Sequence, residues 1–153
     1  MTSLLGRLPP QRTHHIDMRE RDSNMRMIKS IRLGCADIDK SRAFYDATFA
    51  AIGGPANTAP AGYPILMYRG EDSPVLILGK AANGEPTTFA NGGTILFEAP
   101  TAESVAAWHA AGLANGGTCE GQPEPKPQTG GKMGAYLRDP DGNKLGAYFD
   151  FPM

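Results

Sequence analysis

Alternation of apolar and polar residues predicts several short strands in this chain. In the first of them, Ile28–Gly34, the side chains of Ile31 and Leu33 fall on one face, which we expect to be buried. Ser30 and Arg32 then fall on the opposite face, together with Gly34. Further strands are expected at residues 63–68, 75–78, 94–98, 133–138 and 144–149.

Two longer segments have the spacing of amphipathic helices. The first follows Asp37, which suits an N-cap, and ends at Gly53-Gly54. The second has Thr101 as its N-cap and Glu103 in its first turn. Turn-rich segments separate these elements: residues 80–93 are interpreted as a linker, and the Pro-rich residues 121–131 as a loop.

The most informative feature is an internal repeat. Gly53-Gly54 and the helical residues before it recur 63 positions later, ending at Gly116-Gly117, and Asp72 of the first hairpin recurs as Asp141. Each half therefore consists of a strand, a helix and two or three strands, and such a unit leaves one face of its sheet uncovered. We predict an α+β fold in which two βαβββ modules pair side by side, with a curved sheet forming a cup and the helices outside.

The repeat begins only at residue 27. Residues 1–26 are polar and show no period, so we expect a flexible N-terminal tail, and Met25 or Met27 would also suit as the start. The domain then covers residues 27–153, with a first half at 27–80, a linker at 81–92 and a second half at 93–150.

Composition limits the class of protein. Lys and Arg total 15 against 16 for Asp and Glu, a net charge of -1, which argues against a nucleic-acid partner. No run is apolar enough to span a membrane, and the first residues lack the apolar core of a signal peptide. We therefore expect a cytoplasmic protein without membrane contacts.

The cysteines and the histidine of the domain suggest no catalytic group. Cys35 and Cys119 are expected to be buried free thiols at strand ends, with no neighbouring base to activate either. His109 and Trp108 fall on the second helix, outside the cup, and are interpreted as surface or packing residues.

Residues 27–149 resemble the glyoxalase/bleomycin-resistance (vicinal oxygen chelate) family. The resemblance rests on Met27–Gly34, on Ser41–Tyr45 and Val105–His109 in the two helices, and most specifically on the closing run Gly134–Asn143. It implies the paired-module fold with a ligand site in the cup. Members of this family commonly chelate a divalent metal that activates substrate oxygens for isomerisation, dioxygenation or nucleophilic addition, whereas others have lost the metal and sequester a ligand.

The positions that match the family's metal ligands hold no suitable side chain. The two family histidines are matched by Ser30 and Thr94, and the glutamate after the Asp-Gly-Asn turn is matched by Gly146, whose repeat partner is Ile77. A divalent transition metal needs several converging N, S or O donors. We therefore expect no metal and no other cofactor.

Alternation leaves a set of polar and aromatic side chains facing the cup. The expected ligand-binding residues are Ser30, Arg32, Thr94, Glu98, Tyr136 and Tyr148. Arg32 either binds an anionic group of the ligand or forms a structural ion pair with Glu98 or Asp150. Tyr136 matches a position where relatives often place a substrate-contacting tyrosine, or it is an ordinary strand aromatic.

Two classes of function remain open. The first is a metal-free protein, expected to be a homodimer, that binds a small molecule, anionic or aromatic, in the cup. The second is an enzyme of the same family, a lyase, isomerase or dioxygenase, which either works without a metal or uses a displaced metal site. A tyrosine such as Tyr136 is a weak base at neutral pH, which favours binding over catalysis.

Overall fold

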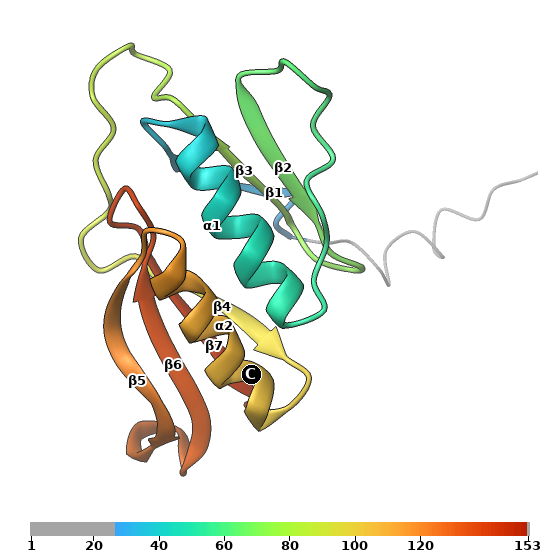
Figure 1. Cartoon of the computed structure of the whole chain (residues 1–153), viewed down its shortest axis with the longest axis vertical. Coiled ribbons are helices and arrows are strands. Elements are labelled where there is room, and N and C mark those ends of the chain that lie inside the picture. The colour runs from blue at the N-terminus through green and yellow to red at the C-terminus, as the bar shows by residue number, and fades with distance from the viewer. Residues whose placement is uncertain (1–26, 153) are drawn as a thin grey trace, which may run out of the picture.

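The chain folds as two sheets backed by two helices (Figure 1). The computed structural model describes residues 27–152. In chain order the elements are β1 (Ser30–Gly34), α1 (Ile38–Ala51), β2 (Ile65–Arg69), β3 (Val75–Gly79), β4 (Ile95–Ala99), α2 (Ala102–Ala114), β5 (Thr118–Lys126), the 3-10 turn η2 (Pro127–Thr129), β6 (Lys132–Arg138) and β7 (Lys144–Phe149). The predicted tail, residues 1–26, lies outside the described residues.

Each half contributes one sheet with the same topology. The first sheet has the strand order β1-β3-β2 and the second β4-β7-β6-β5; in both, the first two strands of the order are parallel and the next pair is antiparallel. In the first half, an isolated bridge between Asn57 and Tyr68 takes the place of the pairing between β5 and β6 in the second half. The predicted α+β fold of two repeated modules is therefore confirmed, with a shorter strand set in the first.

Both helices begin as predicted. The Asp37 carboxylate accepts hydrogen bonds from the backbone N–H groups of Asp39 and Lys40, which otherwise have no partner in the first turn of α1. At the start of α2 the side chains of Thr101 and Ser104 exchange hydrogen bonds with each other's backbone N–H, a capping box.

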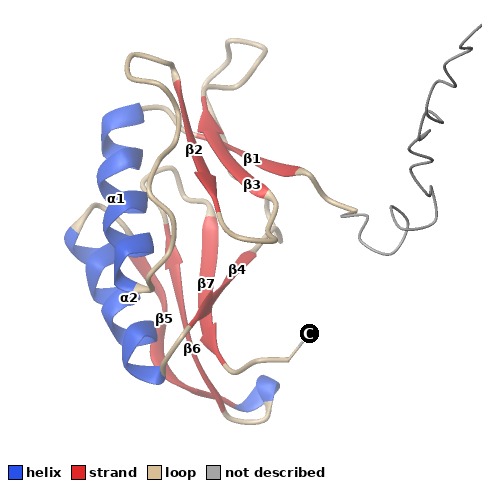
Figure 2. Cartoon of the chain, turned by 90° about the vertical axis from the view of Figure 1, so that its right-hand side faces the viewer, coloured by secondary structure: helices blue, strands red, loops and turns tan. Residues whose placement is uncertain are grey.

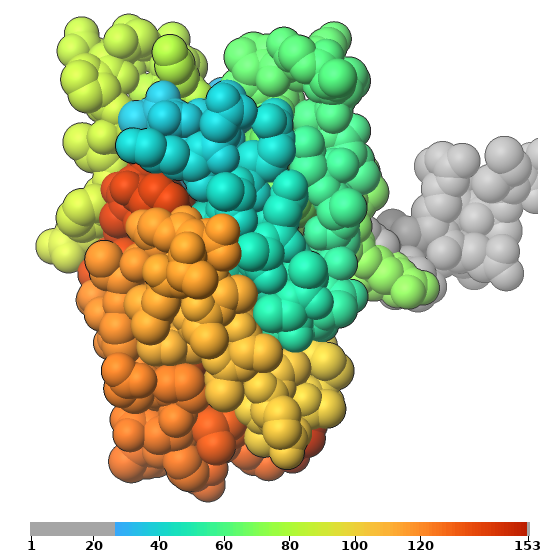
Figure 3. All heavy atoms as spheres, in the orientation of Figure 1, coloured from blue at the N-terminus to red at the C-terminus, as the bar shows by residue number. Residues whose placement is uncertain are grey.

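One apolar core joins the two halves. The helices lie side by side, and their atoms cover one face of the molecule (Figure 3). Phe44 and Phe49 of α1 and Trp108 of α2 are at most 4% exposed, and Phe49 packs edge-on against Phe97 of β4 with ring centroids 5.0 Å apart. Burial of aromatic side chains of this size is the main stabilising contribution to such a core.

The segment after α2 differs from the prediction. The sequence predicts a loop over residues 121–131, but β5 occupies residues up to Lys126 and pairs antiparallel with β6. Proline is tolerated at an edge because one side of an edge strand needs no N–H donor. Register shifts between Cys119 and Gly121, and between Gly121 and Glu124, interrupt the alternation by which a strand is recognised in sequence.

The sheets are open on the side away from the helices (Figure 2). Ile31 and Leu33 pack against the core, whereas Ser30 and Arg32 on the other face of β1 are exposed, as alternation predicts. The same holds for β6, where Ala135 and Leu137 are fully buried. Within residues 27–152 neither helix is long and apolar enough to cross a bilayer.

Candidate functional site

Two tyrosines lie together on the open face of the second sheet. Tyr136 on β6 is paired with Gly146 on β7, and Tyr148 on β7 is paired with Gly134 on β6. The two hydroxyl oxygens are 2.8 Å apart, and the rings meet edge to face with centroids 5.7 Å apart. A hydrogen bond between two hydroxyls uses one of their two protons, so the pair keeps one proton to donate to a ligand.

Each tyrosine ring lies over a glycine of the neighbouring strand, and these glycines determine the position of the rings. A Cβ atom on Gly134 would overlap the Tyr148 ring. A Cβ atom on Gly146 would lie 2.6 Å from Cδ2 of Leu96 and 2.8 Å from Cε1 of Tyr136. Glycine at both positions therefore lets the tyrosines lie close to the sheet.

The environment keeps Tyr148 protonated. Burial, followed by the hydrogen bond with Tyr136, raises the pKa of Tyr148 well above its usual range, and a hydrogen bond with Gln128 opposes this in part. Tyr148 is 3% exposed, and its ring also packs against Phe151 at 5.2 Å. At neutral pH Tyr148 is consequently a neutral hydrogen-bonding group on an aromatic surface.

Tyr148 borders a cavity of about 380 Å³, here called the Tyr148 hollow. Its lining is Leu96, Phe97, Glu98, Tyr148, Phe151 and Pro152. Most of these side chains are apolar or aromatic, and the exposed carboxylate of Glu98 is the one charged group in the lining. The hollow thus offers ring-sized apolar contact next to the tyrosine hydroxyls.

Cations surround the tyrosine pair. The ammonium of Lys144 lies 5.2 Å from the centre of the Tyr136 ring and forms no ion pair within the described residues. Lys132 is paired with Asp150 at 2.6 Å, and Arg138 with Glu120 at 2.8 Å. Lys144 directly follows the turn between β6 and β7, and its sequence position next to a turn does not indicate this contact with Tyr136.

Arg32 lies elsewhere, beside a second cavity of about 540 Å³, the Arg32 hollow. The hollow is lined by Arg32, Cys35, Ala36, Asp37, Ile38, Pro64, Ile65 and Lys80. The Arg32 guanidinium donates a hydrogen bond to the backbone carbonyl of Lys80 at 3.2 Å. No ion pair joins it to Glu98 or Asp150 within the described residues, and Asp150 binds Lys132 instead.

The six expected ligand-binding residues therefore fall into separate places. Glu98 and Tyr148 border one hollow, with Tyr136 hydrogen-bonded to Tyr148, and Arg32 borders the other. Ser30 and Thr94 are exposed and line neither hollow. Their joint role in one ligand site remains a prediction.

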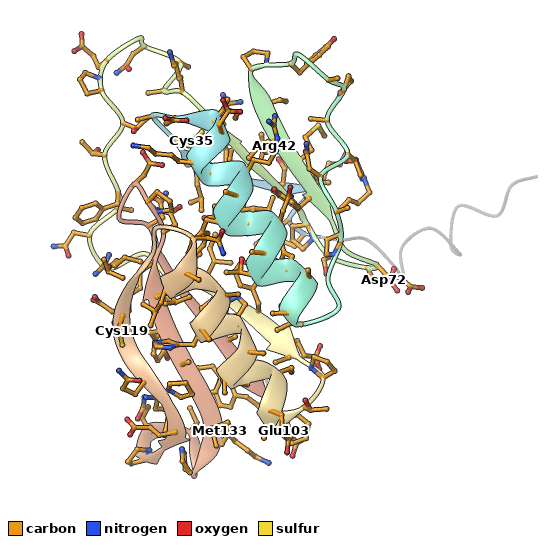
Figure 4. The ribbon with its side chains drawn as sticks, viewed as in Figure 1. Cys35, Arg42, Asp72, Glu103, Cys119 and Met133 are labelled. Atoms are coloured by element: carbon orange, nitrogen blue, oxygen red, sulfur yellow. The ribbon has the colours of Figure 1, made fainter. Side chains whose placement is uncertain are left out.

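The structure also brings together Cys119, labelled in Figure 4, and His109, a contact that the sequence did not predict. The His109 Nε2 atom is 3.2 Å from the Cys119 sulfur. The expectation that neither cysteine has a neighbouring base is thus wrong for Cys119, and so is the expectation that it is buried, because its side chain is exposed. The two residues are ten positions apart, separated by the end of α2 and the turn into β5. Their contact therefore depends on the presence of β5, a strand that the sequence did not predict.

Comparison with known proteins places this geometry in a family. The sequence profile of the Glyoxalase/Bleomycin resistance protein/Dioxygenase superfamily matches residues 27–146. The chain belongs to this superfamily. The crystal structure of a glyoxalase/bleomycin resistance protein from Albidiferax ferrireducens is similar to it at 35% identity and a TM-score of 0.71, over 81% of this chain and 98% of that one.

More distant members of the superfamily share the fold. A glyoxalase-related enzyme from Fulvimarina pelagi is 22% identical over 82% of this chain and 89% of its own, with a TM-score of 0.67. A lactoylglutathione lyase from Agrobacterium tumefaciens is 23% identical over 80% and 92%, with a TM-score of 0.54. No curated protein sequence matches this chain.

The residues that the sequence resemblance matches to the family's metal ligands do not suit a divalent metal. Ser30, Thr94, Ile77 and Gly146 supply no imidazole or carboxylate, and no group of three or more His, Cys, Asp or Glu side chains gathers within residues 27–152. At Gly146, where the superfamily's glutamate would stand, the Tyr136 ring and Leu96 occupy the space that a side chain needs.

Proposed function

We propose that this protein binds a small molecule with an aromatic ring and an anionic group on the open face of its second sheet, without a divalent metal. The observation that supports the proposal most directly is the hydrogen-bonded pair of Tyr136 and Tyr148 laid over two glycines beside the Tyr148 hollow. Small-molecule sites typically combine apolar and aromatic walls with a few placed polar groups.

The aromatic part of the ligand fits the hollow. Phe151 is partly exposed and Leu96 is 38% exposed, so both offer an apolar surface that the protein leaves in contact with water, and the buried Tyr148 ring borders the same hollow. An aromatic ring that covers this surface removes apolar area from water and gains ring-to-ring contact.

The anionic part of the ligand fits the groups around Tyr136. The hydroxyl pair keeps one proton to donate, and Lys144 contributes a positive charge that forms no ion pair within the described residues, although the Glu120 carboxylate lies near enough to interact with it. A carboxylate or phenolate at the rim would accept a hydrogen bond from the pair and attract the ammonium. Glu98 is paired with Tyr148 across β4 and β7, and its carboxylate disfavours an anionic group at that edge of the hollow.

A catalytic role is the second candidate, and one observation supports it. Because the raised pKa keeps Tyr148 protonated, the pair is able to donate a proton or a hydrogen bond to negative charge that develops on a substrate. A lyase, isomerase or dioxygenase-type activity, as in other members of the superfamily, would then convert the bound molecule. The two candidate functions therefore differ in whether the bound molecule is converted to a product.

Arg32 connects the proposal to the oligomeric state. In one chain Arg32 and Tyr148 border different hollows, and pairing of two copies of the protein is one way to bring both to a single ligand. We therefore propose a homodimer if Arg32 proves to be a ligand contact. If the ligand is bound by one chain, the tyrosine pair and Lys144 suffice.

Thermal-shift screening of a metabolite library, followed by calorimetry and product analysis on each hit, tests the proposal. A ligand that binds only the native state raises the melting temperature. Tyr136→Phe should weaken binding of a hit by about 0.5–1.5 kcal/mol, the usual contribution of one hydrogen bond, and Lys144→Met by a similar amount. Elemental analysis of the protein should find no stoichiometric Zn, Fe, Mn or Ni.

The matched control is Tyr63→Phe, which removes the hydroxyl of an exposed tyrosine 57% open to solvent and should leave binding unchanged. Arg32→Met should weaken binding by about 2 kcal/mol if Arg32 grips the anion. Equal binding by Tyr136→Phe, Lys144→Met and the unaltered protein would refute the site. One bound transition metal per chain, removable with loss of an activity, would refute the metal-free mechanism.

A further inference from the structure

The pair formed by Cys119 and His109 lies on the helix side of the second sheet, away from the tyrosines. Cys119 is paired with Leu137 of β6, whose side chain is fully buried beneath the helices, so the Cys119 side chain projects toward α2 and not toward the cup. Figure 4 shows it on β5 beside α2. Any chemistry at this pair is therefore separate from the proposed ligand site.

His109 is buried and Cys119 is exposed, and a reactive thiol requires this combination of a fixed base and an accessible sulfur. His109 is 4% exposed, and its Nε2 atom lies 3.2 Å from the Cys119 sulfur. Cys119 is exposed on an edge strand. The base is thus fixed by packing, whereas the sulfur is open to molecules in solution.

The charge state of His109 suits a proton acceptor. Burial, and to a lesser degree the positive charge of Lys126, lowers the pKa of His109, so the ring is neutral at physiological pH. With its proton on Nδ1, a neutral imidazole accepts the S–H proton at Nε2. Lys126 itself is held by the carbonyl of Gln122 and the carboxylate of Glu124.

We propose that Cys119 is a modification site at which the thiol exchanges with low-molecular-weight disulfides, with His109 as the base. As the sulfur of Cys119 attacks one sulfur of a disulfide RS–SR, its proton passes to His109 Nε2. A new bond forms between Cys119 and that sulfur while the RS–SR bond breaks, and the departing RS⁻ takes the proton from His109. The products are Cys119–S–SR and RSH, with no other oxidant involved.

Two further features agree with modification rather than metal binding or a disulfide within the chain. A metal site needs more ligands than one thiolate and one imidazole, and no third His, Cys, Asp or Glu completes such a group within residues 27–152. The other cysteine, Cys35, is 2% exposed, and burial raises its pKa, so it is the unreactive one of the two thiols. It serves as an internal reference.

The rate at which the reduced, full-length protein reacts with dithiobis-nitrobenzoate and with cystamine tests the proposal. We expect one thiol to react in the native protein, identified as Cys119 by mass spectrometry, and Cys35 to react only after unfolding in urea. Cys119→Ser should abolish the native reaction. His109→Gln should slow it about tenfold or more near neutral pH, as loss of a general base does.

The pH profile separates a base from a packing residue. With His109 as base, the reaction stays fast below the pKa of about 8.5 of an ordinary thiol, whereas the urea-unfolded chain should slow about tenfold for each pH unit below that value. Glu103→Gln, an exposed change on the same helix, should not alter the rate. A native rate and pH profile equal to those of the unfolded chain, or of a folded His109→Gln variant, would overturn the proposal.

Discussion

At the scale of single residues, glycine decides what the open face of the second sheet is able to bind. Gly134 and Gly146 leave room for two tyrosine rings that lie close to the backbone. Alternation placed Tyr136 and Tyr148 on this face from the sequence alone, because side chains of a strand alternate between two faces. Their hydrogen bond and the loss of space at Gly146 could not be predicted, because both depend on how rings of adjacent strands pack across the sheet.

The replacement Gly146→Ala tests this close packing. Its Cβ atom would lie 2.6 Å from Leu96 and 2.8 Å from Tyr136, so one of these side chains must move. We expect a loss of about 1–3 kcal/mol in the free energy of unfolding, as for other overpacked sites, measured by urea denaturation. Gly93→Ala, in an exposed loop where the nearest side-chain atom would be 3.2 Å away, should cost less. Equal stability of the two variants would show that the tyrosines are free to move.

At the scale of elements, β5 shows the limit of pattern recognition. The other strands and both helices lie where periodicity and capping residues place them, with their ends shifted by a residue or two. In β5 the prolines and two register shifts hide the strand, because they remove both the alternation and the expected composition. The contact between Cys119 and His109 was missed for the same reason.

The prolines of β5 have a testable role in keeping this edge unpaired. Pro123 and Pro125 have no backbone N–H, so the edge strand β5 has two fewer donors to offer to another strand. The double replacement Pro123→Val, Pro125→Val should restore these donors and increase self-association, measured by light scattering as a function of concentration. Pro86→Val, in the exposed linker, is the control. If the double variant associates no more than this control, the prolines do not protect the edge.

At the scale of the whole molecule, the turn between β6 and β7 holds the two halves together. Asp141 accepts hydrogen bonds from the backbone N–H of Ala36 at 2.8 Å and from the hydroxyl of Ser41, and Asn143 donates to the carbonyl of Gly34. The repeat in the sequence predicted two similar halves. The repeat could not predict that this turn contacts the first half. The residue types of a turn reflect its own backbone conformation and do not indicate which distant residues it contacts.

Asp139 is the buried centre of this junction. One carboxylate oxygen accepts hydrogen bonds from the Tyr45 hydroxyl at 2.7 Å and from the side-chain amide of Asn143 at 2.8 Å, and the other accepts from the backbone N–H groups of Asp141 and Asn143. Asp139→Asn places an N–H₂ group where two of these donors point. We expect a loss of about 1–3 kcal/mol in the free energy of unfolding, because a buried donor is left without an acceptor.

The matched control is Asp37→Asn, because asparagine caps a helix about as well as aspartate and should leave the stability nearly unchanged.

Burial, although opposed by the hydrogen bonds, raises the pKa of Asp139 in the folded state. In the interval between the unfolded pKa, about 3.9, and the higher folded value, the folded protein holds more protons, so the contribution of Asp139 to stability falls as pH rises. The difference between the unaltered protein and Asp139→Asn, measured by urea unfolding, should therefore be larger at acidic than at neutral pH. A difference that grows toward neutral pH would mean that the hydrogen bonds outweigh burial and that the junction is stabilised by the charged carboxylate.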